Sequence, residues 1–278
     1  MPAWPRKLFA LMPALVHIYP FPRSPSTHFP NTRKMKYCIF GDIHANLEAL
    51  EVVLADAEDQ GCSHYACLGD VVGYNANPRE CLEIVRSLDC PVIKGNHDEE
   101  CSRESTLDGL NPLAYAALNW TRQQMRESEK EYLRGLRLVR QITDFTTVHA
   151  TLDSPGGWAY VQNKFDAMAS FNYQFTTLCF FGHTHVPVAY VQEGPSRPEK
   201  VEVQDAFVKI EPGKKFFINV GSVGQPRDGD WRASYAVYDK ANQTVTVRRL
   251  EYDIGRTQEK ILAAGLPEGL AYRLEEGR

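Results

Sequence analysis

From Met35 onward, short apolar runs alternate with segments of helical periodicity. The predicted elements, in chain order, are a strand at 36–40, a helix at 46–57, a strand at 65–68, a helix at 78–88 and a strand at 91–94. Asn46 and Asn77 stand at the expected N-cap positions, and Pro78 suits the first turn of the second helix. This alternation predicts βα units with parallel strands.

The later part of the chain predicts more strands and fewer helices. The expected strands cover 145–148, 178–181, 216–220, 234–239 and 244–250. Residues 99–141 are mostly helical in pattern, with no convincing strand, and we expect either a lid or simple packing. Residues 193–215, rich in charge, proline and glycine, predict a long hairpin or loop. The change from βα units to hairpins predicts an α/β fold in which two mixed sheets pack together with helices outside.

The first 34 residues differ from the rest in their high proline content. We expect residues 1–34 to be a disordered N-terminal extension, with Met35 as the functional start. Residues 35–255 are predicted to form the main domain, and 256–278 a C-terminal helix or tail. The apolar run at 8–19 is interrupted by Pro13 and is too short to cross a bilayer, so no membrane association is expected.

Composition restricts the partners and the compartment. The formal net charge is -4 at pH 7, which does not favour stable nucleic-acid binding, whereas a small anionic substrate needs only local positive charge. The seven cysteines are scattered and form no Cys-x-x-Cys pair, so neither a disulfide framework nor a thiolate zinc site is predicted. This usage is typical of a reducing cytoplasm. The composition does not predict an oligomeric state.

Polar clusters follow the ends of several predicted strands. They are Gly41-Asp42-Ile43-His44, Gly69-Asp70, Gly95-Asn96-His97-Asp98, His149 and Gly182-His183-Thr184-His185. The carboxyl ends of strands in open α/β sheets meet at one rim, so we expect these clusters to converge. They hold five of the eight histidines, which chance explains poorly.

The residue types in these clusters suit metal ions. The candidate ligands are Asp42, His44, Asp70, Asn96, His149, His183 and His185. Carboxylate, imidazole and amide oxygen without thiolate favour Mn²⁺, Fe²⁺, Co²⁺, Ni²⁺ or Zn²⁺ over Ca²⁺. Seven ligands are too many for one tetrahedral site and suit two metals about 3.5–4 Å apart that share a carboxylate. Manganese is our first expectation.

The series Asp-x-His, Gly-Asp, Gly-Asn-His-Asp, His and Gly-His-x-His resembles the motifs of the calcineurin-like metallophosphoesterase superfamily. The resemblance extends from Met35 to about Leu250 and implies a two-sheet sandwich flanked by helices. It further implies two metal sites that share Asp70 as a bridge. The first would use Asp42, His44 and His185, and the second Asn96, His149 and His183.

The resemblance also implies a mechanism. A hydroxide bridging the two metals would attack phosphorus in line, without a phosphoenzyme. His97 would stabilise the transition state or protonate the leaving oxygen, and Asp98 would orient its ring. Asp98 as a surface turn residue is an equal alternative.

The residues after Asp70 indicate which branch of the superfamily the chain resembles. Gly73 and Tyr74 stand where protein serine/threonine phosphatases place Asp-Arg, and purple acid phosphatases place a tyrosine at the position of Gly73. The chain is more similar to the small prokaryotic phosphodiesterases and nucleotide phosphatases. The expected substrate is therefore a small phosphate ester or nucleotide. A phosphoprotein phosphatase and a non-catalytic binding module remain as alternatives.

Substrate contacts are predicted less sharply. The stretch 219–228 resembles an Asn-Pro-Gly-Ser element of that branch and is expected near the metal rim. Arg227 could bind phosphate or form a surface ion pair with Asp228. Tyr74 and Asn75 could face the substrate, although packing beneath the loop suits Tyr74 as well. Trp158 could stack on a nucleobase.

Overall fold

Strand β1 (Lys36–Phe40) contributes to two cores, because successive side chains of a strand point to opposite faces. Tyr37 and Ile39 pack between the two sheets, whereas Cys38 and Phe40 pack against helices on the outer face. The structure is a computed structural model that describes residues 35–278 apart from 105, 108 and 204–206. The expectation for residues 1–34 lies outside the described residues.

The first sheet has the strand order β2-β1-β10-β11-β8. Its remaining strands are β2 (His64–Cys67), β8 (Phe207–Lys209), β10 (Ala233–Asp239) and β11 (Thr244–Leu250). β1 and β2 are parallel, as expected for a βα unit, and the other neighbours are antiparallel.

The second sheet has the order β3-β4-β5-β9-β6-β7. Its strands are β3 (Val139–Ile142), β4 (Phe145–Val148), β5 (Leu178–Phe181), β6 (Val188–Glu193), β7 (Glu199–Val201) and β9 (Lys214–Asn219). β4, β5 and β9 run parallel, so the loops after them leave from the same edge.

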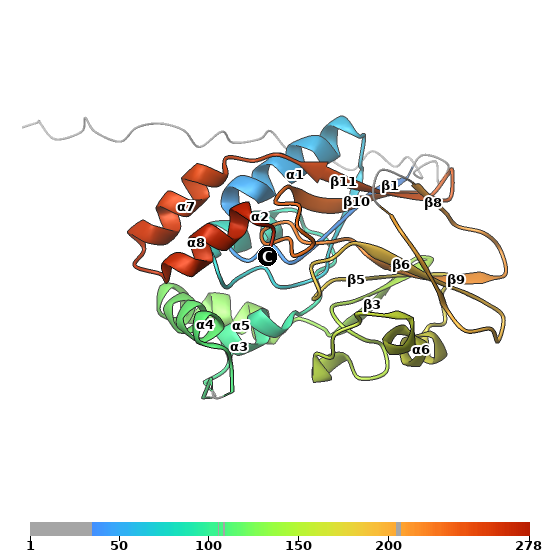
Figure 1. Cartoon of the computed structure of the whole chain (residues 1–278), viewed down its shortest axis with the longest axis horizontal. Coiled ribbons are helices and arrows are strands. Elements are labelled where there is room, and N and C mark those ends of the chain that lie inside the picture. The colour runs from blue at the N-terminus through green and yellow to red at the C-terminus, as the bar shows by residue number, and fades with distance from the viewer. Residues whose placement is uncertain (1–34, 105, 108, 204–206) are drawn as a thin grey trace, which may run out of the picture. The chain divides into compact units, whose positions relative to one another are not determined.

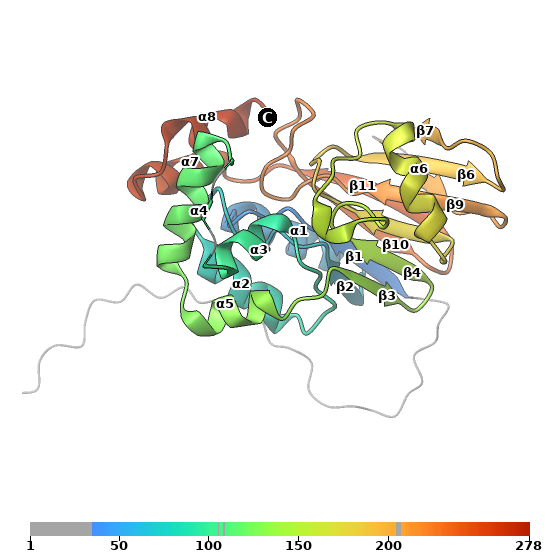
Figure 2. The ribbon, with the colours of Figure 1, turned by 90° about the horizontal axis from the view of Figure 1, so that it is seen from below.

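Helices lie outside the two sheets, over their faces and at one end of the described fold (Figure 1). They are α1 (Leu47–Asp59), α2 (Pro78–Ser87), α3 (Asn96–Ser102), α4 (Pro112–Gln124), α5 (Glu127–Arg134), α6 (Lys164–Tyr173), α7 (Ile254–Ala263) and α8 (Glu268–Glu275). Helix α1 packs on the first sheet, and α6 packs on the second through Ala167 and Phe171. Figure 2 shows α4, α7 and α8 gathered at the end away from α6. The predicted α/β architecture of two packed mixed sheets is confirmed.

Several local expectations need correction. The Asn46 side chain accepts from Ala49 N–H at 3.1 Å and caps α1 as predicted. Asn77 precedes α2 but makes no side-chain cap bond, because its amide oxygen accepts from Lys260 Nζ instead. Residues 91–94 form only isolated bridges rather than a full strand. The segment 99–141, predicted to lack strands, contains most of β3.

Weak sequence signals explain the elements that were missed. Strand β6 and helix α6 were not predicted. The short strands β7 and β8, of three residues each, lie within the segment predicted as a long hairpin or loop, 193–215. The seven cysteines are all free in the structure. Among the described residues, no helix is both long and apolar enough to cross a membrane.

Candidate metal centre

The seven predicted ligands come together, and all but Asn96 are buried. Six of them are at most 5% exposed: Asp42, His44, Asp70, His149, His183 and His185. Their ligand atoms form two groups, one of Asp42, His44, Asp70 and His185, the other of Asp70, His149 and His183. Asp70 belongs to both. Within each group all the candidate donor atoms lie within 4.8 Å of one another. Asn96, the seventh, has its amide oxygen 3.2 Å from His149 Nε2.

Backbone carbonyl groups orient the four imidazole rings. Nδ1 faces a carbonyl oxygen in His44 (Val72, 3.3 Å), His149 (Leu68, 2.7 Å) and His185 (Gln225, 2.5 Å). A carbonyl can only accept, so each Nδ1 carries the proton, and in a neutral ring Nε2 keeps the free electron pair. In His183 it is Nε2 that faces a carbonyl oxygen, that of Trp158 at 2.9 Å. Nε2 therefore carries the proton in this ring, and Nδ1 keeps the free electron pair. Such bonds prepare imidazole for metal ligation.

Burial and close charges shift the pKa values in the centre. Burial lowers the pKa of His183 to about 4 and the pKa of His44 and His185 well below the usual range. Burial also opposes charge on His149, but the Asp70 carboxylate 3.3 Å away outweighs it and raises the pKa of His149 to about 9. The Asp70 pKa is held low despite burial by this ring and by His97.

The loops that carry the ligands adopt unusual backbone conformations. Five of the predicted ligands have positive φ: Asp42, His44, Asp70, His183 and His185. Such conformations are costly for residues other than glycine and tend to cluster at functional sites. The loops also hold one another, since Asp42 N–H donates to the Gly69 carbonyl and His44 N–H to the Asp70 carbonyl. The backbone hydrogen bonds therefore hold the two ligand-bearing loops against each other.

Two of the glycines in the motifs leave room for carboxylates. A Cβ on Gly95 would collide with the carboxylate and backbone nitrogen of Asp70, and one on Gly182 would collide with the carboxylate of Asp42. The close approach of backbone to ligand explains why these positions lack a side chain.

The donor set fits two divalent ions. Two neighbouring groups of nitrogen and oxygen donors share one carboxylate, which is the arrangement expected for a pair of borderline metals. No cysteine belongs to either group.

His97 lies beside the centre without belonging to either group of ligands. Its ring centroid is 4.7 Å from that of His44, and its backbone N–H donates to Asp70 Oδ1 at 2.8 Å. Nδ1 is buried without a hydrogen-bond partner among the described residues. Burial lowers the pKa of this ring to about 4. A Cβ on Gly73 would overlap the His97 ring, so the glycine at this position makes room for it.

Asp98 occupies a different place from the one expected. Its Oδ1 accepts from the N–H groups of Val71 (2.9 Å) and Val72 (3.4 Å), and its Oδ2 from Gly95 N–H (3.0 Å). It is fully buried, so the surface-turn alternative is wrong. Its observed bonds join two ligand-bearing loops rather than orienting the ring of His97.

Tyr74 and Asn75 are buried supports. The Tyr74 side chain is 5% exposed and contacts the rings of His44 and His97 at centroid distances of 4.7 and 4.4 Å. Asn75 donates from Nδ2 to the His44 carbonyl at 2.7 Å and is 1% exposed. We expected Asn75 to face the substrate, but its side chain is buried and holds the backbone of the His44 loop instead.

The glycine-rich stretch 219–228 lies against the ligand loops, as predicted. Ser222 Oγ and Gly224 N–H both donate to the Asp42 carbonyl, and Asn219 donates to the Gly182 carbonyl. Arg227 donates from Nη2 to Gln225 Oε1 at 2.8 Å. Asp228 pairs with Arg249 instead of Arg227, so the ion pair considered for Arg227 is not formed.

Two contributors were not foreseen. Tyr160 stacks on His183 with ring centroids 4.2 Å apart and is 49% exposed, and the Gln225 carbonyl orients His185. The glycines around Gln225 indicated a loop near the site, whereas no local sequence pattern indicated a role for Tyr160. Trp158 lies edge-on to His149, with a centroid distance of 5.9 Å, and turns its chain through a positive φ.

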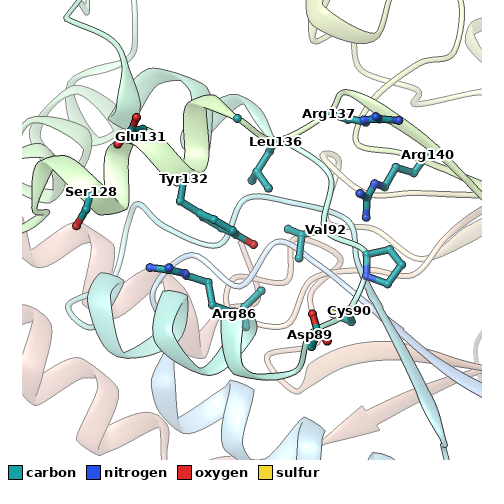
Figure 3. A pocket seen from close by; sticks show the side chains of 13 residues that line it. Arg86, Asp89, Cys90, Val92, Ser128, Glu131, Tyr132, Leu136, Arg137 and Arg140 are labelled. Carbon is teal, nitrogen blue, oxygen red and sulfur yellow. The ribbon is translucent and has the colours of Figure 1, made fainter.

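A separate cavity lies between α2, α5 and the chain before β3 (Figure 3). Arg86, Tyr132, Arg137 and Arg140 are among the residues that line it, and Arg86 lies over the Tyr132 ring. None of the predicted site residues lines this cavity, so it is distinct from the metal centre.

Comparison with known proteins agrees with this geometry. Residues 35–243 match the calcineurin-like phosphoesterase superfamily domain. The chain belongs to this superfamily. A metallophosphoesterase from Sphaerobacter thermophilus has a similar crystal structure, with 42% identity, a TM-score of 0.80 and coverage of 88% of this chain and all of that one. The family assignment makes this chain a member of a group of metal-dependent hydrolases of phosphate esters.

Two further relatives extend the comparison. An uncharacterized protein of Methanocaldococcus jannaschii is 36% identical over 249 residues, covering 88% of this phosphoesterase and 99% of the relative. A hypothetical protein from Pyrococcus horikoshii shares the fold at 19% identity and a TM-score of 0.69, covering 88% of this chain and 99% of the other.

Proposed function

We propose that this phosphoesterase hydrolyses phosphodiesters or nucleotide-type phosphate esters at two divalent metal ions. The observation that carries the proposal is the pair of buried ligand groups sharing Asp70. Asp42, His44 and His185 would hold one ion, and Asn96, His149 and His183 the other, in agreement with the resemblance described above. When bound, such ions supply charge neutralisation of the phosphoryl group and acidification of water.

The residues of the chain have separate tasks in this proposal. The backbone-oriented imidazoles keep their free nitrogens directed at the ions. His97, beside the centre but outside both ligand groups, stabilises charge on the phosphoryl oxygens or gives a proton to the leaving oxygen. Arg227 binds a phosphoryl oxygen, and its charge acts on His44, His97 and His185.

Metal identity and cell compartment are also part of the proposal. The nitrogen and oxygen donors support manganese first, with iron, nickel, cobalt or zinc as alternatives. Seven free cysteines support a reducing, cytoplasmic location. Residues 35–255 are proposed as the catalytic domain, with 99–141 as an insert that packs or moves as a lid.

The direct test is hydrolysis of bis-p-nitrophenyl phosphate. We expect turnover that disappears in chelator and returns with Mn²⁺, together with two metal ions per chain by elemental analysis. Lack of turnover of any phosphate ester across the candidate metals would contradict the enzyme assignment. A screen that includes phosphopeptides separates the alternatives, because clear preference for phosphopeptides over diesters would favour a protein phosphatase instead.

A further inference from the structure

The last helix brings a second arginine close to Tyr74. The guanidinium carbon of Arg227 lies 5.7 Å from the centre of the Tyr74 ring, and that of Arg273 lies 6.0 Å from it. The same ring contacts His44 and His97. Both guanidinium groups therefore lie near the same aromatic ring that contacts His44 and His97.

The position of Arg273 is set by two independent contacts of α8. Leu270 and Leu274 are buried in a cluster that also contains Tyr74. At the end of the helix, Gly229 N–H donates to the Gly277 carbonyl at 3.1 Å, which joins α8 to the loop that carries Arg227. Figure 2 shows the C-terminal end beside this loop. Helix α8 lies beyond residues 35–243, the part matched by the family domain.

The observed side-chain partner of Arg227 is neutral. Arg227 donates to the amide oxygen of Gln225, and its Nε is buried without a hydrogen-bond partner among the described residues. Arg273 Nε donates to the main-chain oxygen of Arg278. The nearest acidic neighbour in sequence, Asp228, pairs with Arg249. No ion pair of the Arg227 side chain occurs in the described part of the chain.

The two positive charges also oppose each other. Burial and the charge of Arg227 lower the pKa of Arg273. Two partly desolvated guanidinium groups that repel each other are unfavourable, and an anion that binds both would relieve the repulsion. Guanidinium groups present paired N–H donors that match phosphate oxygens.

We propose that Arg227 and Arg273 form a subsite for a second phosphate group, next to the phosphate handled at the metal centre. The substrate class is then a compound with linked phosphates, such as a nucleoside diphosphate or triphosphate, rather than a simple diester with one phosphorus. This inference rests on the proposed function and specifies its substrate.

The test measures ligand binding and does not depend on turnover. The Mn²⁺-loaded full chain, in excess Mn²⁺ so that chelation does not strip the centre, is titrated calorimetrically with inorganic phosphate and with imidodiphosphate, a non-hydrolysable linked diphosphate. For Arg273→Gln we expect imidodiphosphate affinity to fall about tenfold or more, and phosphate affinity by much less. The imidodiphosphate affinity of Arg273→Lys should lie between those of the parent and of Arg273→Gln, because lysine keeps the charge and loses the planar donor pair.

Arg256→Gln is the matched control, since it removes one positive charge from the neighbouring helix α7, where Arg256 pairs with Glu48. It should leave both affinities unchanged. An unchanged ratio of the two affinities in Arg273→Gln, or an equal fall in both, would overturn the subsite. If Arg273→Gln does not fold, the ratio in Arg273→Lys decides. Failure of all phosphate esters to react would refute the proposed function while leaving this binding ratio measurable.

Discussion

Asp70 connects the parts of the candidate centre at the scale of single residues. Its Oδ1 accepts from His97 N–H, its Oδ2 lies 3.3 Å from His149 Nε2 and 3.5 Å from His44 Nε2, and it belongs to both ligand groups. His97 has contacts with the same centre but no place in either group. Replacement of Asp70 and replacement of His97 are therefore expected to have different effects on metal content and turnover.

For His97→Ala we expect full metal content and turnover reduced about 10²-fold or more, because an acid–base or charge-stabilising group is lost. For Asp70→Ala we expect loss of both metal and turnover, because both ligand groups lose a member. Elemental analysis and steady-state kinetics of the two purified variants check this. Metal loss in His97→Ala to the same extent as in Asp70→Ala would contradict the division of roles.

Gly95 tests the close approach of backbone to carboxylate. For Gly95→Ala we expect loss of metal binding and a decrease of about 1–3 kcal/mol or more in the free energy of unfolding, because the new methyl group overlaps Asp70. The matched control is Gly255→Ala in α7, where the nearest atom to a new Cβ is 3.8 Å away. Denaturant unfolding and metal analysis should distinguish Gly95→Ala clearly from Gly255→Ala. Normal metal binding in Gly95→Ala would show that the loop relaxes freely.

At the scale of elements, a partly buried polar contact joins α1 to the first sheet. Asp56 on α1 accepts hydrogen bonds from Tyr235 Oη on β10 (2.5 Å) and from Arg248 Nη2 on β11 (2.7 Å). Partial burial opposes the charge of Asp56, but the bonds from Arg248 and Tyr235 outweigh it and lower its pKa. The helix that follows the Asp42 loop is fixed in this way to the strands opposite it.

Because the pKa of Asp56 is lower in the folded state, its contribution to stability is present above the unfolded value of 3.8 and is lost as pH falls through the folded pKa. For Asp56→Asn we expect about 1–2 kcal/mol less stability at about pH 7, with the difference from the parent narrowing below about pH 4. Urea unfolding across this range measures it. Asp59→Asn, an exposed position on the same helix, is the control, and a pH-independent difference in Asp56→Asn would contradict the linkage.

At the scale of the whole molecule, the described fold starts with Met35. Its carbonyl accepts from Lys240 N–H at 3.1 Å, and β1 begins at the next residue, between β2 and β10 in the first sheet. For a chain that starts at Met35 we expect cooperative unfolding and the same metal content and turnover as the full chain. Circular dichroism melting and kinetics of the two proteins compare them. Loss of folding or activity would refute the expectation that residues 1–34 are an extension.

The sequence determined the local part of this architecture well. Strands β1, β4, β5 and β11 begin and end where the apolar runs predicted, and Asn46 caps its helix, because these features depend on neighbouring residues. The clustering of histidine, aspartate and asparagine at strand ends also predicted which side chains converge, since parallel strands direct their carboxyl ends to one edge.

Only the tertiary structure decided contacts between residues distant in the chain. Asp98 bonds to the Asp70 loop, Tyr160 stacks on His183, and α8 brings Arg273 near Tyr74, about two hundred residues earlier in the chain. Short strands such as β7 and β8 likewise depend on partners in the sheet. No local periodicity encodes these contacts, because they arise when packing of the two sheets and their helices brings separate loops to the same rim.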